Sequence, residues 1–248
     1  MADQIKRVVI NGFRYYQVIN ESGIVGTFPS VTTVLGETSD KTGLNQWRDR
    51  IGHAKADQIG QDAANRGTVM HRLCELYLNL PSSLSQKDRL DETLSISRLD
   101  DEIDKFDTRA KIVGGMLFYN FIKANSFNEI HKVIAQEKFL WTSRDGGYAG
   151  TVDNVSELIN GDIGVVDFKT AKKPKDEKWI EDYKHQVAAY SVAIWDRLNI
   201  KSTTCKIWIS NEVTDKPQHF SISPSEMKEY YFKFRERLAK FYKMHPII

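Results

Sequence analysis

The spacing of apolar residues changes along the chain, and each change predicts a different element. Apolar-rich runs over residues 7–10 and 13–19 predict two strands, and Asn11-Gly12 between them predicts a tight hairpin turn. A third short strand over 24–28 would extend the hairpin into a small sheet. The N-terminal segment is therefore expected to be a β elaboration beside the rest of the chain.

Helical spacing follows from Leu44 to about Leu80, where apolar residues recur every three or four positions. Within this stretch a second helix is expected to begin close to Gly67. Residues 81–107 are polar and acidic, and we expect a mobile connection with some helix. Residues 110–124 return to helical spacing and predict another helix.

The second half of the chain alternates between strand and helix patterns. Strands are predicted over 129–141, 148–159, 163–169, 203–210 and 219–222, with a helix over 177–198 and a C-terminal helix that Ser223 and Glu226 cap. This order predicts a mixed α/β fold. We expect one domain over 1–248, made of an N-terminal hairpin (1–43), a helical part (44–126), a core (127–222) and a C-terminal helix (223–248).

Composition narrows the class of protein. The 248 residues include 35 Lys and Arg against 33 Asp and Glu, a net charge of +2, so a polycationic coat for nucleic acid is excluded. No apolar run approaches the roughly 20 residues of a membrane span, and no signal or transit peptide is evident. Two cysteines cannot form a disulfide framework. We expect a cytoplasmic protein that contacts no membrane.

The segment around Asp167 and Lys169 carries the most distinctive chemistry. Residues two apart on a strand share a face, so these side chains lie together while Val166 and Phe168 point into the core. If a three-residue loop, 160–162, joins the strands, Asp153 falls opposite Lys169. A two-residue loop would place Asp153 on the other face. We therefore predict a loop of odd length.

Two carboxylates at one point repel each other unless a cation joins them. Oxygen ligands suit Mg²⁺ or Mn²⁺, which bind phosphate oxygens and assist phosphodiester hydrolysis. Lys169 could then hold water or stabilise the transition state. For the Asp-x-Lys triplet alone, a surface salt bridge at a strand end remains the simpler interpretation.

Three further features lie in order around this triplet. Gly67 and His71 are four apart on one helix face, as are Gln186 and Tyr190 on a later helix. Glu137 is a carboxylate within an apolar strand, where an edge-strand charge and a site role are equally good interpretations. Each feature alone is ordinary, but their order along the chain is informative.

Together these motifs resemble the PD-(D/E)xK nuclease superfamily in its RecB-like branch. The motifs are Gly67-x-x-x-His71, Glu137, Gly150-x-x-Asp153, Asp167-x-Lys169 and Gln186-x-x-x-Tyr190. PSVTTVL at 29–35, followed by a tryptophan-containing helix and RGTVMH, resembles more narrowly the mitochondrial genome maintenance exonuclease and its phage-encoded relatives. The resemblance implies a restriction-endonuclease-like core.

The resemblance also implies roles for individual residues. Asp153 and Asp167 would be metal ligands and Lys169 the catalytic lysine, while His71 and the less certain Glu137 would be further ligands. Gln186 and Tyr190 would line the site as catalytic or substrate-holding groups. The metal would be Mg²⁺ or Mn²⁺.

Some relatives carry four cysteines for an iron–sulfur cluster. Here only Cys74 and Cys205 are present, so no cluster is expected, and both are better interpreted as small buried residues.

DNA contacts are expected from residues that flank these motifs. The candidates are Arg66, Lys172, Lys173, Lys175, Ser30, Thr32, Trp47 and Arg48. Each has an ordinary alternative: the lysines can form a solvated loop, Trp47 and Trp179 can belong to the core, and Ser30 or Thr32 can cap a helix.

The expected function is metal-dependent hydrolysis of DNA by an exonuclease that prefers single strands or flap ends, in replication, repair or recombination. A structure-specific endonuclease and a catalytically inactive DNA-binding protein of the same fold are the alternatives. The missing transit peptide favours a bacterial or phage protein. Nothing in the sequence identifies a protein partner.

Overall fold

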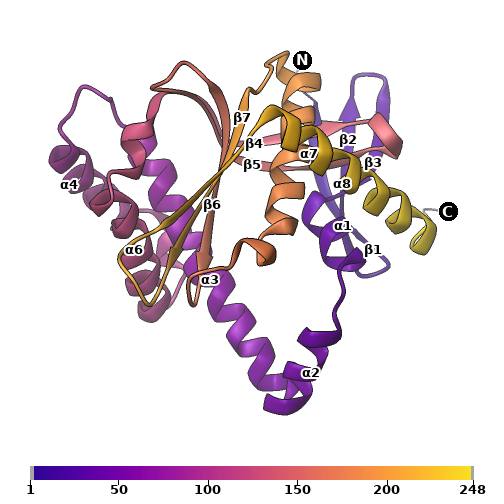
Figure 1. Cartoon of the computed structure of the whole chain (residues 1–248), viewed down its shortest axis with the longest axis horizontal. Coiled ribbons are helices and arrows are strands. Elements are labelled where there is room, and N and C mark those ends of the chain that lie inside the picture. The colour runs from indigo at the N-terminus through magenta and orange to yellow at the C-terminus, as the bar shows by residue number, and fades with distance from the viewer. Residues whose placement is uncertain (1–2, 247–248) are drawn as a thin grey trace.

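The computed structural model describes residues 3–246, which are built around a five-stranded sheet. Its strands follow chain order: β4 (Ile130–Thr142), β5 (Tyr148–Leu158), β6 (Ile163–Ala171), β7 (Thr204–Asn211) and β8 (Gln218–Ile222). β6 and β7 are parallel, and the other neighbours are antiparallel. Helices lie on both sides of the sheet (Figure 1). The predicted mixed α/β fold and its five core strands are confirmed.

One face of the sheet packs against α3 (His53–Asn79) and α6 (Thr108–Lys123). Val166 and Phe168 of β6 belong to this core, as their alternation predicts. Gly114 lets the two helices approach, because a Cβ there would lie 2.7 Å from Val69. Burial of this apolar face fixes α3, and thus everything that α3 carries, against β6.

The other face packs against three helices, α1 (Val31–Thr38), α7 (Glu181–Leu198) and α8 (Pro224–Met244). α7 begins four residues later than predicted, because residues 177–179 form a separate 3₁₀ turn, η3 (Glu177–Trp179). α8 has the predicted capping box of Ser223 and Glu226.

A three-stranded antiparallel sheet of β1 (Gln4–Ile10), β2 (Phe13–Asn20) and β3 (Gly23–Pro29) precedes α1. Asn11 and Gly12 both have positive φ, 52° and 84°, which is the backbone of the predicted two-residue turn. The hairpin and its third strand are therefore confirmed.

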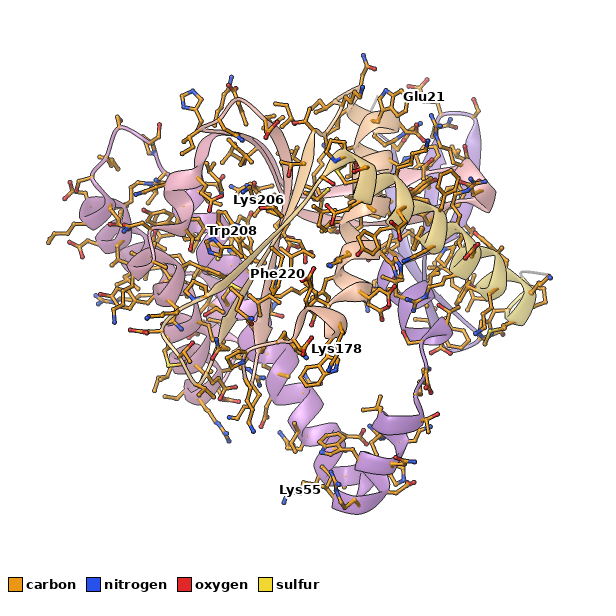
Figure 2. All side chains as sticks on the ribbon, viewed as in Figure 1. Glu21, Lys55, Lys178, Lys206, Trp208 and Phe220 are labelled. Atoms are coloured by element: carbon orange, nitrogen blue, oxygen red, sulfur yellow. The ribbon has the colours of Figure 1, made fainter. Side chains whose placement is uncertain are left out.

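A helical hairpin leads from this sheet into the main body. α2 (Thr42–Ile51) buries no residue, and Gly52, with φ of 88°, turns the chain into α3. The predicted helix start near Gly67 is wrong: α3 runs unbroken from His53, since one glycine inside a long helix costs only about 1 kcal/mol. α2 and the first turns of α3 stand away from the sheet, with Lys55 at their outer end (Figures 1 and 2).

Residues 81–107 contain the helix that was expected within this connection. They form α4 (Gln86–Ser97) and the short α5 (Asp101–Asp104). Arg89 anchors α4 by donating to the carbonyl of Tyr77 at 2.9 Å and by lying over that residue's ring. Ile103 of α5 is buried in the α3–α6 core.

The remaining turns are short 3₁₀ segments, η1 (Ser126–Glu129) and η2 (Arg144–Gly146). Cys74 and Cys205 are free and buried, as expected. Within residues 3–246, no helix combines the length and the apolarity that crossing a bilayer requires.

Arg237 of α8 joins three helices through one guanidinium. It donates to the carbonyl of Leu35, to Thr38 Oγ1 at 2.8 Å and to Ser39 Oγ at 2.7 Å, all at the C-terminal end of α1. It also forms an ion pair with Asp182 of α7. The carbonyl of Leu35 and two hydroxyls at that helix end are thereby satisfied by a side chain from the far end of the chain.

Asp182 makes this junction sensitive to acid. Partial burial would raise the pKa of Asp182, but hydrogen bonds from His185, Arg237 and Ser39 outweigh burial and hold that pKa well below its usual range. A carboxylate with a depressed pKa in the folded state stabilises the fold above its unfolded pKa, about 3.9, and loses that contribution as the pH falls further. We therefore expect the free energy of unfolding to drop below about pH 4 partly through Asp182.

Urea denaturation at pH 7, 4 and 3 measures this effect. Asp182→Asn should lower stability at pH 7 and narrow the difference in stability between pH 7 and pH 3. Asp57→Asn, at an exposed carboxylate on α3, is the control. An Asp182→Asn variant that loses as much stability as the wild type between pH 7 and pH 3 would contradict the assignment.

Candidate active site

The site lies where β5 and β6 separate. Their backbone pairing ends at Asn154 and Val166, and beyond it the N–H of Phe168 donates to the Asp153 carboxylate at 2.8 Å. Asp153 thus takes the place of a ladder partner and sits beside Asp167. The loop between the last pair, Glu157 and Ile163, has five residues, 158–162, so its predicted odd length is confirmed. The prediction that Asp153 lies opposite Lys169 is wrong by two residues, because the loop has five residues and not three.

Asp167 and Lys169 form an ion pair on the face toward α7. Lys169 Nζ lies 2.5 Å from Asp167 Oδ2, and Asp167 is 1% exposed. Burial raises the pKa of Asp167 to about 7; Lys169 opposes that rise and Asp153 adds to it. Burial also disfavours the charge of Lys169, but the two carboxylates outweigh it and raise the pKa of Lys169, so its ammonium stays charged.

His71 and Glu137 approach Asp153 from the other side. His71 Nδ1 lies 3.5 Å from Asp153 Oδ2, and one ligand atom each from His71, Glu137 and Asp153 lie within 4.8 Å of one another. Burial lowers the pKa of His71, and Asp153 only partly offsets this, which favours the neutral imidazole. Loss of hydration, with the charges of Asp153 and Glu75, raises the pKa of Glu137 to about 8.

Glu137 takes its position through an unusual backbone. Its φ is +42°, a left-handed conformation that a glutamate rarely adopts, within a strand whose register shifts at Val133–Ala135. Alternation along β4 does not reveal such a position. The strained backbone supports the site role of Glu137 over an edge-strand charge.

These donors suit a divalent cation. A neutral imidazole and two carboxylates form the cluster, and the carboxylate of Asp167 lies next to Asp153. Burial, and after it the charges of neighbouring carboxylates, raises the pKa of Asp167 and of Glu137, and a bound cation would favour the charged form of both. Carboxylate ligands with one imidazole fit Mg²⁺ or Mn²⁺.

Gln186 and Tyr190 of α7 close the site from the opposite side. Gln186 Nε2 donates to Asp167 Oδ1 at 3.2 Å and also hydrogen-bonds Tyr190. Tyr190 reaches this position because residue 150 is glycine: a Cβ there would lie 2.8 Å from the Tyr190 hydroxyl. Burial and the nearby carboxylates raise the pKa of Tyr190 far above its ordinary value, so it is a permanent hydrogen-bond donor. Gly150 and Asp153 both belong to β5, where Gly150 makes room for Tyr190 and Asp153 lies beside Asp167.

A cavity of about 640 Å³ opens beside this cluster. Gly67, His71, Arg72, Glu75 and Glu137 are among its lining residues. Gly67 faces β6, where a Cβ would meet Thr170 Oγ1 at 3.6 Å, an ordinary van der Waals distance. The motif glycine and histidine thus share this cavity wall.

The basic residues expected to contact DNA fall into two groups. Arg66 and Lys172 both pair with Glu212, at 3.1 and 2.5 Å, so one carboxylate partly neutralises both. Lys173 is exposed beyond β6. Lys175 is half-buried, and its backbone exchanges two hydrogen bonds with Gln218.

The other expected DNA contacts lie on α1 and α2. Ser30 is buried and caps α1 by accepting from the N–H of Thr33 at 3.0 Å, so the helix-cap alternative is the correct one for Ser30. Thr32 is exposed. Trp47 is half-exposed on α2, and Arg48 beside it pairs with Asp57 at 2.7 Å.

Two further residues near the site carry no motif. Arg14 of β2 donates to Ser30 Oγ and to Thr32 Oγ1, and Tyr183 places its ring 5.3 Å from Lys169 Nζ. Tyr183 precedes Tyr190 by seven residues, so helical spacing could have identified it. No sequence signal singles out Arg14, because only the fold of β2 brings it to α1.

Comparison with known proteins places this geometry in a family. Residues 46–241 match the model of the PD-(D/E)XK nuclease superfamily. A curated relative, one of the subunits of an ATP-dependent helicase/deoxyribonuclease from Streptococcus mutans serotype c (strain ATCC 700610 / UA159), is 24% identical over 164 residues. That match covers 62% of this chain but only 15% of the relative.

Two crystal structures are more distantly similar. A candidate exonuclease from Eubacterium rectale gives a TM-score of 0.38 at 10% identity, over 62% of this chain and 61% of that one. The protein SSO0001 gives 0.33 at 11% identity, over 67% and 82%. Such low scores carry no argument about function, whereas the family match spans most of the sequence and includes every motif of the site. The chain belongs to the PD-(D/E)XK nuclease superfamily.

Proposed function

We propose that this protein is a metal-dependent exonuclease that hydrolyses DNA from single-stranded or flap ends. The observation that carries the proposal is the convergence of Asp153, Asp167 and Lys169 with His71 and Glu137 where β5 and β6 part. One face of the sheet supplies the imidazole and the other supplies the lysine. A surface salt bridge at a strand end would not gather these groups.

The chain's own residues divide the chemistry. Asp153, Glu137, His71 and Asp167 would hold Mg²⁺ or Mn²⁺, which when bound would acidify a water and offset phosphate charge. Lys169 is charged and fixed by Asp167, so it can orient water or stabilise the pentavalent phosphate. Gln186 holds Asp167 in place, and α7 shields this side from bulk water.

Two tryptophans at the surface, one exposed and one partly buried, support a single-stranded substrate. Trp179 of η3 is 62% exposed, so the alternative of a core residue is wrong for it, and Trp47 of α2 is half-exposed. Exposed indoles can stack on unpaired bases without sequence preference. Lys178 of η3 adds charge beside Trp179, with its Nζ 5.4 Å from the centre of the ring. It lies on the side of the molecule that faces α2 (Figure 2). Lys173 is a further exposed cation between β6 and η3.

A time course on end-labelled single-stranded, duplex and flap DNA, with Mg²⁺ or Mn²⁺, tests the proposal. We expect release of short products from single-stranded ends, and no cleavage when EDTA replaces the ions. Circular single-stranded DNA should remain intact. Cleavage of the circle would replace the exonuclease with the endonuclease alternative, and no cleavage of any substrate would favour the inactive DNA-binding protein.

A further inference from the structure

A second cavity, of about 300 Å³, lies between the N-terminal hairpin and α1. Its lining includes Arg7 of β1 and Arg14 of β2, together with Thr32 and Thr33 of α1. Glu37 also lines it, but this carboxylate is paired with Lys41 at 2.8 Å. The balance of charge in the cavity is therefore positive.

Arg14 is held in this cavity by hydroxyl groups and by the ring of Tyr16, whose centre lies 5.9 Å from its guanidinium carbon. Its Nε and Nη2 donate to Ser30 Oγ at 3.2 and 3.1 Å, and Nη2 also donates to Thr32 Oγ1. Among residues 3–246, neither Arg14 nor Arg7 forms an ion pair with a carboxylate. The hydroxyls fix the fork of Arg14 without neutralising it, which leaves its charge for an anion.

The donors of this cavity are side chains and not the end of α1. The N–H of Thr33 is already bonded to Ser30 Oγ at 3.0 Å, so Ser30 occupies that helix end. Thr32 is exposed and its hydroxyl can donate to a second acceptor. A planar guanidinium beside a hydroxyl is the arrangement that suits a tetrahedral phosphate.

This cavity is connected to the active site through β5. Ser30 forms an isolated bridge with Ala149, whose neighbour Gly150 contacts Tyr190. The positive charge of Arg14 also acts on the Tyr190 hydroxyl, as do the charges of Asp153 and Asp167. A strand whose scissile phosphate lies at Asp153 could thus place another of its phosphates at Arg14.

We propose that Arg14, with Arg7 and Thr32, forms a subsite for a phosphate of the substrate strand at a distance from the bond that is cut. The inference rests on the proposed function and adds two arginines that no motif contains, Arg14 and Arg7, to the expected contact at Thr32. Its ligand is a terminal phosphate or an internal phosphodiester of single-stranded DNA. Both present the same non-bridging oxygens to the guanidinium.

Binding without cleavage tests the subsite. Fluorescence anisotropy with EDTA present measures the Kd of three oligothymidylates of equal length, one with a 5′-phosphate, one with a 3′-phosphate and one with neither. Arg14→Gln should raise Kd about tenfold, since it removes a charge-assisted contact, and should flatten the slope of log Kd against log salt by about 0.7. Thr32→Val should raise Kd less.

The three oligomers distinguish the sources of the phosphate. A loss confined to one phosphorylated end assigns a terminal phosphate, and an equal loss for all three assigns an internal one. Lys6→Gln is the matched control, because Lys6 is an exposed cation on the opposite face of β1 from Arg7. Arg14→Lys keeps the charge without the fork and should fall between wild type and Arg14→Gln. Circular dichroism melting confirms that each variant is folded.

Two results would overturn the subsite: equal losses in Arg14→Gln and Lys6→Gln, or no binding by the wild type. The proposed function fails separately. A wild type that binds through Arg14 but does not cut DNA with Mg²⁺ or Mn²⁺ retains the subsite and loses the nuclease assignment. If the wild type cuts DNA and Arg14→Gln binds DNA as tightly as the wild type, the nuclease assignment is retained and the subsite is lost.

Discussion

Replacing Lys169 with methionine is expected to lower the rate of DNA cleavage about a thousandfold while DNA binding stays within a few-fold of the wild type. A fixed cation that acts on charge developing in the transition state typically contributes this much. Methionine keeps most of the volume of the lysine stem, so packing beside Tyr183 is preserved. Single-turnover cleavage and anisotropy binding measure the two effects.

The structure offers a matched control for this variant. Lys206 on β7 has the same exposure as Lys169, 18% against 17%, and a similar ion pair, with Glu129 at 2.7 Å. It lies on the neighbouring strand near Trp208 (Figure 2), and it is not among the residues of the carboxylate cluster. Lys206→Met should therefore cut DNA at the wild-type rate. Robust cleavage by Lys169→Met, or an equal loss in both variants, would defeat the assignment of Lys169.

Replacing Arg237 with alanine is expected to lower the free energy of unfolding by about 3 kcal/mol, the low end for breaking a buried ion pair because Asp182 is partly exposed. The variant leaves Asp182 without its cation and removes the Arg237 donors to the Leu35 carbonyl, the Thr38 hydroxyl and the Ser39 hydroxyl. For a chain of this size the melting temperature should fall by roughly 6 to 12 °C. Differential scanning calorimetry and urea denaturation measure the loss.

Arg235 provides the comparison on the same helix. Its guanidinium pairs with Asp145 at 2.7 Å but is 42% exposed, and such pairs contribute at most about 1 kcal/mol. Arg235→Ala should therefore melt within about 4 °C of the wild type. If both variants lose the same stability, Arg237 has no special role in joining α1, α7 and α8.

Much of the fold can be predicted from short stretches of sequence, because turns, helix caps and strand alternation depend on residues that are close together in the chain. Asn11-Gly12 selects a hairpin turn, Ser223 and Glu226 start α8, and alternation separates Val166 and Phe168 from their neighbours. The start of α3 was mispredicted because a glycine inside a long helix lowers its stability by only about 1 kcal/mol and does not end it, so α3 continues through Gly67.

The motif residues could be named from sequence, but their geometry could not. The position of Asp153 depends on the register between β5 and β6. The loop between their last pair is two residues longer than predicted, and this difference shifts the register. Glu137 depends on a left-handed backbone that its strand pattern conceals. The position of Arg14 cannot be predicted from a motif, because this residue reaches α1 only after the N-terminal sheet folds against the core. Glu212, which binds Arg66 and Lys172, likewise acts across distant segments.

The junction at Arg237 also bears on the order of events during folding. Its bonds to Leu35, Thr38 and Ser39 connect residues 202, 199 and 198 positions apart in sequence. Contacts of such separation form late, since closing a long loop costs entropy before any bond repays it. On the ribosome, α1 has to wait for α8 before its C-terminal end is held. The carboxylate cluster draws only on residues up to 190, so we infer that it is assembled before the N-terminal hairpin and α1 are locked in place beside it.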